Sequence, residues 1–382
     1  MSFKSLTVTL LVAALLVPAL AQAQDPDEPK LNVRLLVQPQ IQLGDKMNPA
    51  GDGWGNDFFL RRARIILAGN VNKWIHFFYE TDNPNFGKEG KFDTSLYTQD
   101  AYVDFQFMPE LKVAVGLILL PFTHNSRQSA ASQNTLDYHN FYTGKFIAEK
   151  GWRDMGVEAR GIIVNKVDYR LGVYNGLRGT KCPPENPGCT ILNEDDMPRF
   201  TGRVAFNLFD PEPDYFYSGI LLGKKLASGE LMKIASVGVG FDVQPGAVLD
   251  SKGNLKGYSA ISGDLFLDYP LDANMEIVAQ AAFLMYDRGY VPGKDAGTFV
   301  QDANSGMGYY GEIAFRYGMF APVFSYESYD ADNGETNDAT NILGGVNMFI
   351  KGHNANVKLQ YGRLDQAGDT KNVVTLQTQL LF

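Results

Sequence analysis

Seven arginines stand in stretches where polar and apolar residues alternate, and each falls on the polar side of its stretch. A guanidinium group keeps its charge at any working pH and presents a planar fork that suits phosphate or carboxylate oxygens. Cations on the wall of a water-filled pore would favour anions. The alternative is structural, with the arginines facing acids such as Asp100, Asp104, Glu158 and Asp168 on neighbouring strands. The seven are Arg34, Arg62, Arg64, Arg160, Arg170, Arg203 and Arg316.

A second group of cations lies in the long connection over residues 123–152, which is longer than an ordinary loop and is therefore expected to have a function. Its apolar and aromatic residues could anchor it to a wall. We interpret it as a constriction loop folded into a lumen, with Arg127, Lys145 and Lys150 as candidate anion contacts. The alternative is an exposed surface flap.

Motifs for enzyme catalysis are missing: the sequence has no nucleophile elbow, zinc-protease motif, phosphate-binding loop or dinucleotide-binding glycine pattern. Four scattered histidines suggest neither a metal site nor a catalytic triad. We therefore predict a protein that is not an enzyme and needs no cofactor or metal. The two cysteines, Cys182 and Cys189, lie close together in a proline-stiffened stretch and are expected to form a disulfide in an oxidising compartment.

The elements that must position these residues are strands, because the dominant period after residue 30 is two. Leu31, Val33 and Leu35, for example, alternate with Asn32 and Arg34. A soluble sandwich also alternates, so the connections decide. Short turns near 69–73, 108–111, 164–166, 270–273 and 352–355 alternate with long polar connections at 44–57, 83–95, 123–152, 177–198, 288–305 and 331–338. This pattern, with aromatic residues at many segment ends, is typical of a transmembrane barrel.

Seventeen candidate segments start near residues 31, 58, 74, 96, 112, 153, 166, 199, 215, 234, 258, 274, 306, 320, 339, 355 and 371. Bacterial single-chain barrels have an even number of strands. Assigning directions from both ends of the chain produces a conflict between about 199 and 257. We therefore predict an all-β antiparallel barrel in which one of the segments at 199, 215 and 234 does not span, leaving sixteen strands, with eighteen as the alternative. A barrel of this size leaves an aqueous lumen.

The N-terminus carries one cation, an apolar run and a small-x-small site at Ala21–Ala23, so residues 1–23 are expected to be a signal peptide and residues 24–382 a single barrel domain. No later window is apolar and long enough for a transmembrane helix. The formal net charge of −9 argues against nucleic acid as a partner.

Several short motifs resemble the phosphate-selective porins O and P. Phe58–Arg64 with Gly69 and Val71 is similar to an early strand of that family, and Gly116 with Pro121–Phe122 to the start of its third loop. Tyr174–Gly176 and Gly202–Val204 are similar to later landmarks. The last strand, ending in Phe382, resembles the C-terminal signal that the outer-membrane assembly machinery recognises. The resemblance implies a homotrimeric sixteen-stranded porin with its third loop inside and an anion-attracting lining.

Together these observations predict a passive channel in the outer membrane of a Gram-negative bacterium, in contact with membrane lipid and lipopolysaccharide. The expected solutes are small and hydrophilic, with anions such as phosphate or small carboxylates favoured. One alternative is a porin for sugars, peptides or cations. Another is a structural or adhesive barrel that does not conduct.

Overall fold

The chain folds into one closed antiparallel barrel. The computed structural model describes residues 29–139, 152–177, 192–250, 252–291, 305–332 and 338–382. These contain sixteen strands, which are β1 (Lys30–Gly44), β2 (Gly55–Asn70), β3 (Ile75–Asp82), β4 (Tyr97–Met108), β5 (Leu111–Leu119), β6 (Arg153–Ile163), β7 (Val167–Tyr174), β8 (Arg199–Asn207), β9 (Ile234–Leu249), β10 (Leu255–Pro270), β11 (Met275–Asp287), β12 (Gly306–Tyr317), β13 (Phe320–Ala331), β14 (Ala339–Lys351), β15 (Ala355–Gln366) and β16 (Asp369–Leu381).

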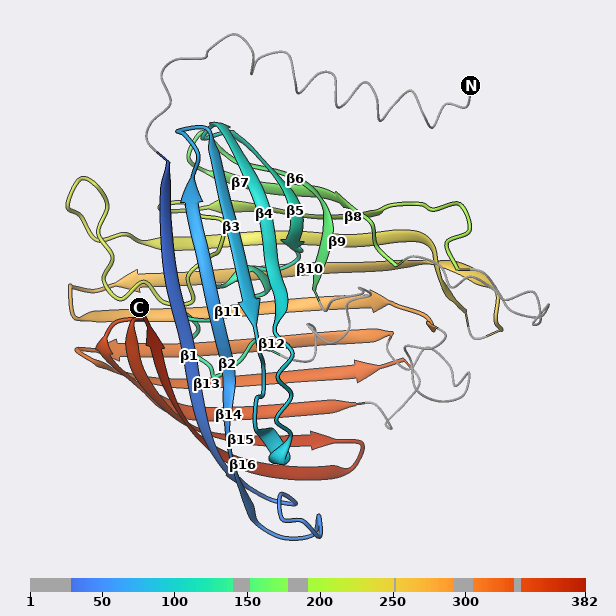
Figure 1. Ribbon diagram of the computed structural model, residues 1–382, viewed down its shortest axis with the longest axis vertical. Helices are drawn as coiled ribbons and strands as arrows, with labels where there is room; N and C mark the ends of the chain where they lie inside the picture. Colours follow the sequence, from blue (N-terminus) through green and yellow to red (C-terminus); the bar gives the residue numbers. More distant parts are fainter. Residues whose placement is uncertain (1–28, 140–151, 178–191, 251, 292–304, 333–337) are drawn as a thin grey trace.

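Each strand pairs with its neighbours in the chain, and β1 pairs with β16 to close the barrel (Figure 1). The closing register sets Leu36 opposite Leu381 and Gln40 opposite Gln377. At its end, the Leu35 amide donates to the Phe382 carbonyl at 2.7 Å, and the Phe382 amide donates to the Leu35 carbonyl at 3.1 Å. Closure therefore leaves no free sheet edge, and the predicted sixteen-stranded barrel is confirmed.

The two faces of the wall have the polarity opposite to that of a soluble protein. In β9, Val237 and Val239 are 58% and 64% exposed, whereas the alternating residues Ser236, Asp242 and Gln244 are buried. The apolar residues thus face outward and the polar residues face the lumen, as lipid on one side and water on the other require. None of the helical segments in the described residues is long and apolar enough to cross a membrane.

Most connections at one edge of the barrel, the short-turn edge, are short. Most at the other edge, the long-loop edge, are longer, although residues 367–368 alone join β15 to β16 there. Short turns join β2 to β3, β4 to β5, β6 to β7, β10 to β11, β12 to β13 and β14 to β15. One connection at this edge is long: residues 208–233, between β8 and β9, contain the candidate segment near 215, which is not a strand of the barrel. Pro211 and Pro213 lack the amide that a strand needs for its ladder. The segment that does not span is therefore the one at 215.

A charge on the outward face tests which side contacts lipid. Ile261 lies near the middle of β10 and is 53% exposed. We expect Ile261→Arg to lower the free energy of unfolding by about 2–4 kcal/mol in lipid vesicles, because a cation near the bilayer midplane loses its hydration. Leu271→Arg, in the turn after β10, is the control and should change stability little. Equal effects of the two variants in urea unfolding would contradict the orientation.

Candidate functional site

The connection between β5 and β6 lies against lumen-facing side chains on distant parts of the wall. We call its described part, residues 120–139, the lumen loop. Gln128 donates to the Gln280 side chain of β11 at 3.1 Å, and Lys358 of β15 donates to the Thr135 carbonyl at 2.9 Å. Gln379 of β16 donates to the Ala131 carbonyl at 2.8 Å. The loop follows β5, and these partners on β11, β15 and β16 lie on the other side of the closed barrel, so the lumen loop crosses the interior.

The 208–233 segment enters the same interior from the short-turn edge. Two carboxylates of the wall hold it by its backbone: the Leu221 amide donates to Asp268 of β10 at 2.7 Å, and the amides of Leu222 and Gly223 each donate to Glu276 of β11 at 3.0 Å. This second insertion was not expected from the sequence.

The two insertions meet in the lumen. The Ser129 amide donates to the Tyr217 carbonyl, and the Tyr217 amide donates to the Arg127 carbonyl, both at 3.0 Å. A side-chain contact joins them as well, because His124 Nε2 lies 2.7 Å from Glu212 Oε2. The His124 ring stacks between Tyr217 and Phe266, with ring centres 4.5 and 3.8 Å away. The two insertions therefore form one joined structure that narrows the interior. It is connected to the wall at the long-loop edge and at the short-turn edge of the barrel.

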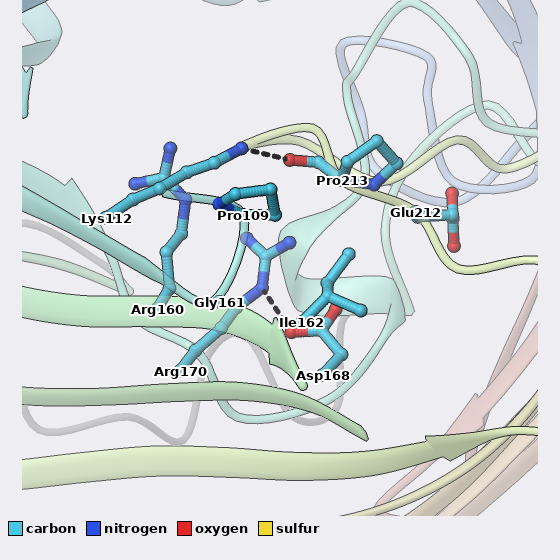
Figure 2. Close-up of a pocket in the computed structure, with 9 residues that line it drawn as sticks. All are labelled: Pro109, Lys112, Arg160, Gly161, Ile162, Asp168, Arg170, Glu212 and Pro213. Atoms are coloured by element: carbon cyan, nitrogen blue, oxygen red, sulfur yellow. Dashed lines mark hydrogen bonds and ion pairs between the residues drawn. The ribbon is translucent and has the colours of Figure 1, made fainter. Parts of the chain in front are cut away.

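Beside this structure, four cations stand directly opposite one another on four adjacent strands. Lys112 of β5 is paired in register with Arg160 of β6, Arg160 with Arg170 of β7, and Arg170 with Arg203 of β8. We call Lys112, Arg160, Arg170 and Arg203 the cationic row. Figure 2 shows the first three directed toward the 208–233 segment, where Lys112 donates to the Pro213 carbonyl at 3.1 Å.

Like charges opposite each other destabilise a sheet, so acids compensate most of the row. Arg160 binds Asp104 with two hydrogen bonds of 2.7 Å, and the shorter Arg203 contact to Asp264 is 2.6 Å. Arg170 lies 3.5 Å from Asp168 and donates to the Tyr215 carbonyl at 2.6 Å. Lys112 has no ion pair among the described residues. The Nε group of Arg160 is buried and has no hydrogen-bond partner there.

A β-bulge creates another cation cluster on β2. The register between β1 and β2 sets Gln38 opposite Arg62 but Pro39 opposite Leu60, so Arg61 is the extra residue. Both arginines consequently bind Asp137 of the lumen loop; Arg61 Nε lies 2.7 Å from its Oδ2. Burial disfavours the charged form of Asp137, but the two guanidinium groups outweigh it and lower its pKa to about 2.

The remaining predicted arginines occupy different surroundings. Arg34 is exposed and lines a cavity of about 440 Å³ near Tyr217 and Lys224, with no ion pair among the described residues. Arg64 binds Glu80 and Asp82, and Arg316 binds Glu276. Arg127 is fully buried and pairs with Glu158 at 3.1 Å. Its role as an anion contact stays a prediction.

Four of the predicted residues lie outside the described residues: Lys145, Lys150, Cys182 and Cys189.

Two cations of the site were not predicted from the sequence, Lys112 and Arg61. Lys112 is in phase with the polar face of its strand and could have been found by extending the alternation. Arg61 could not, because the bulge changes the phase. Among the described residues, no group of three or more histidine, cysteine, aspartate or glutamate side chains could hold a metal ion.

Comparison with known proteins agrees with this geometry. The family described as phosphate-selective porin O and P matches residues 33–167, which include β2 to β6 and the lumen loop. The resemblance to phosphate-selective porins O and P is confirmed. An uncharacterized protein of Aquifex aeolicus (strain VF5) is 24% identical over 396 residues, covering 93% of this chain and 87% of the relative.

Solved porins share the fold of this porin-like chain. The anion-selective porin of Comamonas acidovorans has a TM-score of 0.56 at 14% identity, and OmpT of Vibrio cholerae, solved in a trimer form, has 0.51 at 11% identity. Each comparison covers 93% of this chain and 100% of the other. Fold and family match together support an outer-membrane channel for small solutes rather than an enzyme.

Removing the second insertion tests whether it narrows the lumen. In the variant, a two-residue Asn-Gly turn replaces residues 212–231, because Asp210 and Lys233 already pair across the base of the segment. We expect a larger single-channel conductance in planar bilayers. Deleting residues 48–53 from the connection between β1 and β2 serves as the control. An unchanged conductance in the 212–231 variant would show that the segment does not limit the current.

A histidine at the end of the lumen loop predicts a pH dependence. His139 lies 3.2 Å from Glu312 and 3.5 Å from Glu327 and stacks on Tyr310. Burial opposes its charge, but the hydrogen bonds to the two carboxylates raise its pKa to about 9. We call the ion pairs of His139 with Glu312 and Glu327 the histidine anchor. Its stabilising effect is complete below the pKa of about 6.5 that histidine has in the unfolded chain, and it is lost as the pH rises through about 9.

We expect the open-channel current noise to increase between pH 8 and 10 as the anchor weakens. His139→Gln should show the high-noise state already at pH 7, with no further change over that interval. A wild-type noise level independent of pH over the same interval would contradict the anchor.

Proposed function

We propose that this outer-membrane channel favours small anions, with phosphate and small carboxylates as the solute class. The observation that carries the proposal is the cationic row, which sets four cations on adjacent strands beside the joined insertions. The three guanidinium groups of the row keep their charge at every physiological pH.

Two features of the row support a preference for anions over a purely structural role. Lys112 has no ion pair among the described residues, and the Asp168 carboxylate that accompanies Arg170 lies 3.5 Å away. Positive charge that the wall acids do not closely balance attracts anions into the lumen. Arg34 adds an exposed cation at a cavity that the 208–233 segment also lines. The anion-selective name of the Comamonas porin agrees with this proposal.

The maturation and assembly of the channel are part of the same proposal. Residues 1–23 would be removed as a signal peptide, and three copies would assemble in the outer membrane beside lipopolysaccharide. Phe382 is 67% exposed at the end of the closing strand pair, which leaves its side chain accessible to the assembly machinery. The trimer form of the Vibrio porin supports the same assembly state.

Neutralising the two unpaired cations tests the selectivity. We expect Arg34→Gln combined with Lys112→Gln to shift the reversal potential in a salt gradient toward cation preference, because two uncompensated positive charges leave the lumen. Lys371→Gln, on an exposed position of β16, is the matched control. The double variant should also need more phosphate to block the current.

An unmoved reversal potential would refute the role of these cations. If neutralising Arg127, Lys145 and Lys150 together moved the potential while the double variant did not, the selectivity would lie in the 123–152 connection. A channel that prefers cations or is insensitive to phosphate would favour a different solute class. A folded barrel without conductance would favour a structural role.

A further inference from the structure

The bulge in β2 makes a carboxylate-binding site from two consecutive arginines. Adjacent residues of a regular strand face opposite sides, so Arg61 and Arg62 would be separated by the wall. The shifted register instead lets both guanidinium groups reach the lumen side. This arrangement concentrates two positive charges on one acceptor, and bulges often re-aim side chains in this way near functional sites.

The occupant of this site belongs to the protein itself. Arg61 grips the Asp137 carboxylate with a two-pronged contact, Nε to Oδ2 at 2.7 Å and Nη2 to Oδ1 at 2.8 Å, and Arg62 Nη2 binds Oδ1 as well. Parallel N–H bonds to both oxygens are the strongest geometry for recognising a carboxylate. Two cations bind one anion, so the cluster retains one positive charge.

The site is open to solutes, unlike most ion pairs of the lumen. The side chains of Arg61 and Asp137 are 23% and 25% exposed, whereas those of Arg203 and Asp264 are 2% and 0% exposed. Arg61 and Arg62 also line a cavity of about 340 Å³, together with Tyr138 and Trp152. A small molecule can therefore approach the two arginines from this cavity.

We propose that Asp137 is a tethered competitor that occupies a solute carboxylate site formed by Arg61 and Arg62. This inference rests on the proposed anion channel and names carboxylates as the solutes of this site. A solute carboxylate exchanges with Asp137, and the loop carboxylate rebinds when the solute leaves. The tether gives Asp137 a high local concentration, so solute binding stays weak. Conduction needs such a balance, because a tightly held ion would not leave.

The fluorescence of Trp152 reports on ligand binding at the cavity without any measurement of current. The chain has three tryptophans, so Trp54→Phe and Trp74→Phe leave Trp152 as the single tryptophan, at the cavity, which can be excited selectively. In this background, acetate is titrated into the detergent-solubilised protein. We expect Asp137→Asn to lower the half-saturating acetate concentration by roughly tenfold or more, because the tethered competitor is removed.

Three comparisons make the test specific. Asp365→Asn, which removes the partner of Arg363 in an exposed pair, is the matched control and should leave the titration unchanged. Arg61→Gln added to Asp137→Asn should abolish the gain. Arg61→Gln alone keeps Asp137 on the loop and should remove the acetate response. This single variant still tests the site if Asp137→Asn alters folding. Phosphate should titrate more weakly than acetate.

The inference is overturned if Asp137→Asn titrates at the unmodified concentration, if the gain survives Arg61→Gln, or if phosphate matches acetate. Reversal potentials measured on the same variants keep the two proposals apart. An acetate response without anion preference in the bilayer would refute the proposed function alone. Anion preference without an acetate gain in Asp137→Asn would refute the competitor alone.

Discussion

The whole architecture depends on satisfying backbone hydrogen bonds in a medium that offers none. A sheet edge in hydrocarbon would leave a row of unpaired amides and carbonyls, each costing several kcal/mol. The pairing of β1 with β16 removes that edge, down to the reciprocal bonds between Leu35 and Phe382. Once the sheet is closed, every strand has one face toward lipid and one toward the lumen, and the alternation along the chain follows.

Closure of the barrel also places like charges close together on the lumen face, where they repel one another. Inward-facing positions on adjacent strands bring Arg160, Arg170 and Arg203 side by side. Most of this charge is compensated by wall acids, and breaking such a buried pair costs about 3–5 kcal/mol. Other wall acids, Asp268 and Glu276, bind backbone amides of the 208–233 segment instead. The same polar face thus stabilises the wall and holds the insertions, and among the described residues it leaves Lys112 without an ion pair.

Much of the fold could be predicted from the sequence, because period-two hydropathy and the spacing of turns are local properties. They led to sixteen strands and to a conflict between 199 and 257, which the structure resolves at the segment near 215. That segment resembles a strand, since Tyr215 and Tyr217 are buried on alternate positions. Alternation reports that one side is covered but not what covers it. Here Tyr215 and Tyr217 are covered inside the barrel, by the lumen loop and by side chains of the wall.

The parts of the site that could not be predicted depend on contacts between distant residues. Arg61 was missed because the phase of β2 is set by Pro39 on another strand, which no periodicity within β2 reveals. The pairing of Ser129 with Tyr217 joins insertions that are separated by three strands. Neither insertion carries a sequence signal for its partner, because a backbone bond requires no particular side chain.

The order of these partners along the chain implies that the lumen is completed last. The lumen loop precedes its anchors Lys358 and Gln379, which lie on β15 and β16. The 208–233 segment likewise precedes Asp268 and Glu276. Contacts this distant in sequence carry a loop-closure entropy cost that falls once the intervening strands are in place. The lumen loop can therefore complete its contacts only when β15 and β16 are in place, whereas these bonds of the 208–233 segment need only β10 and β11. The final position of the lumen loop is thus coupled to closure of the barrel.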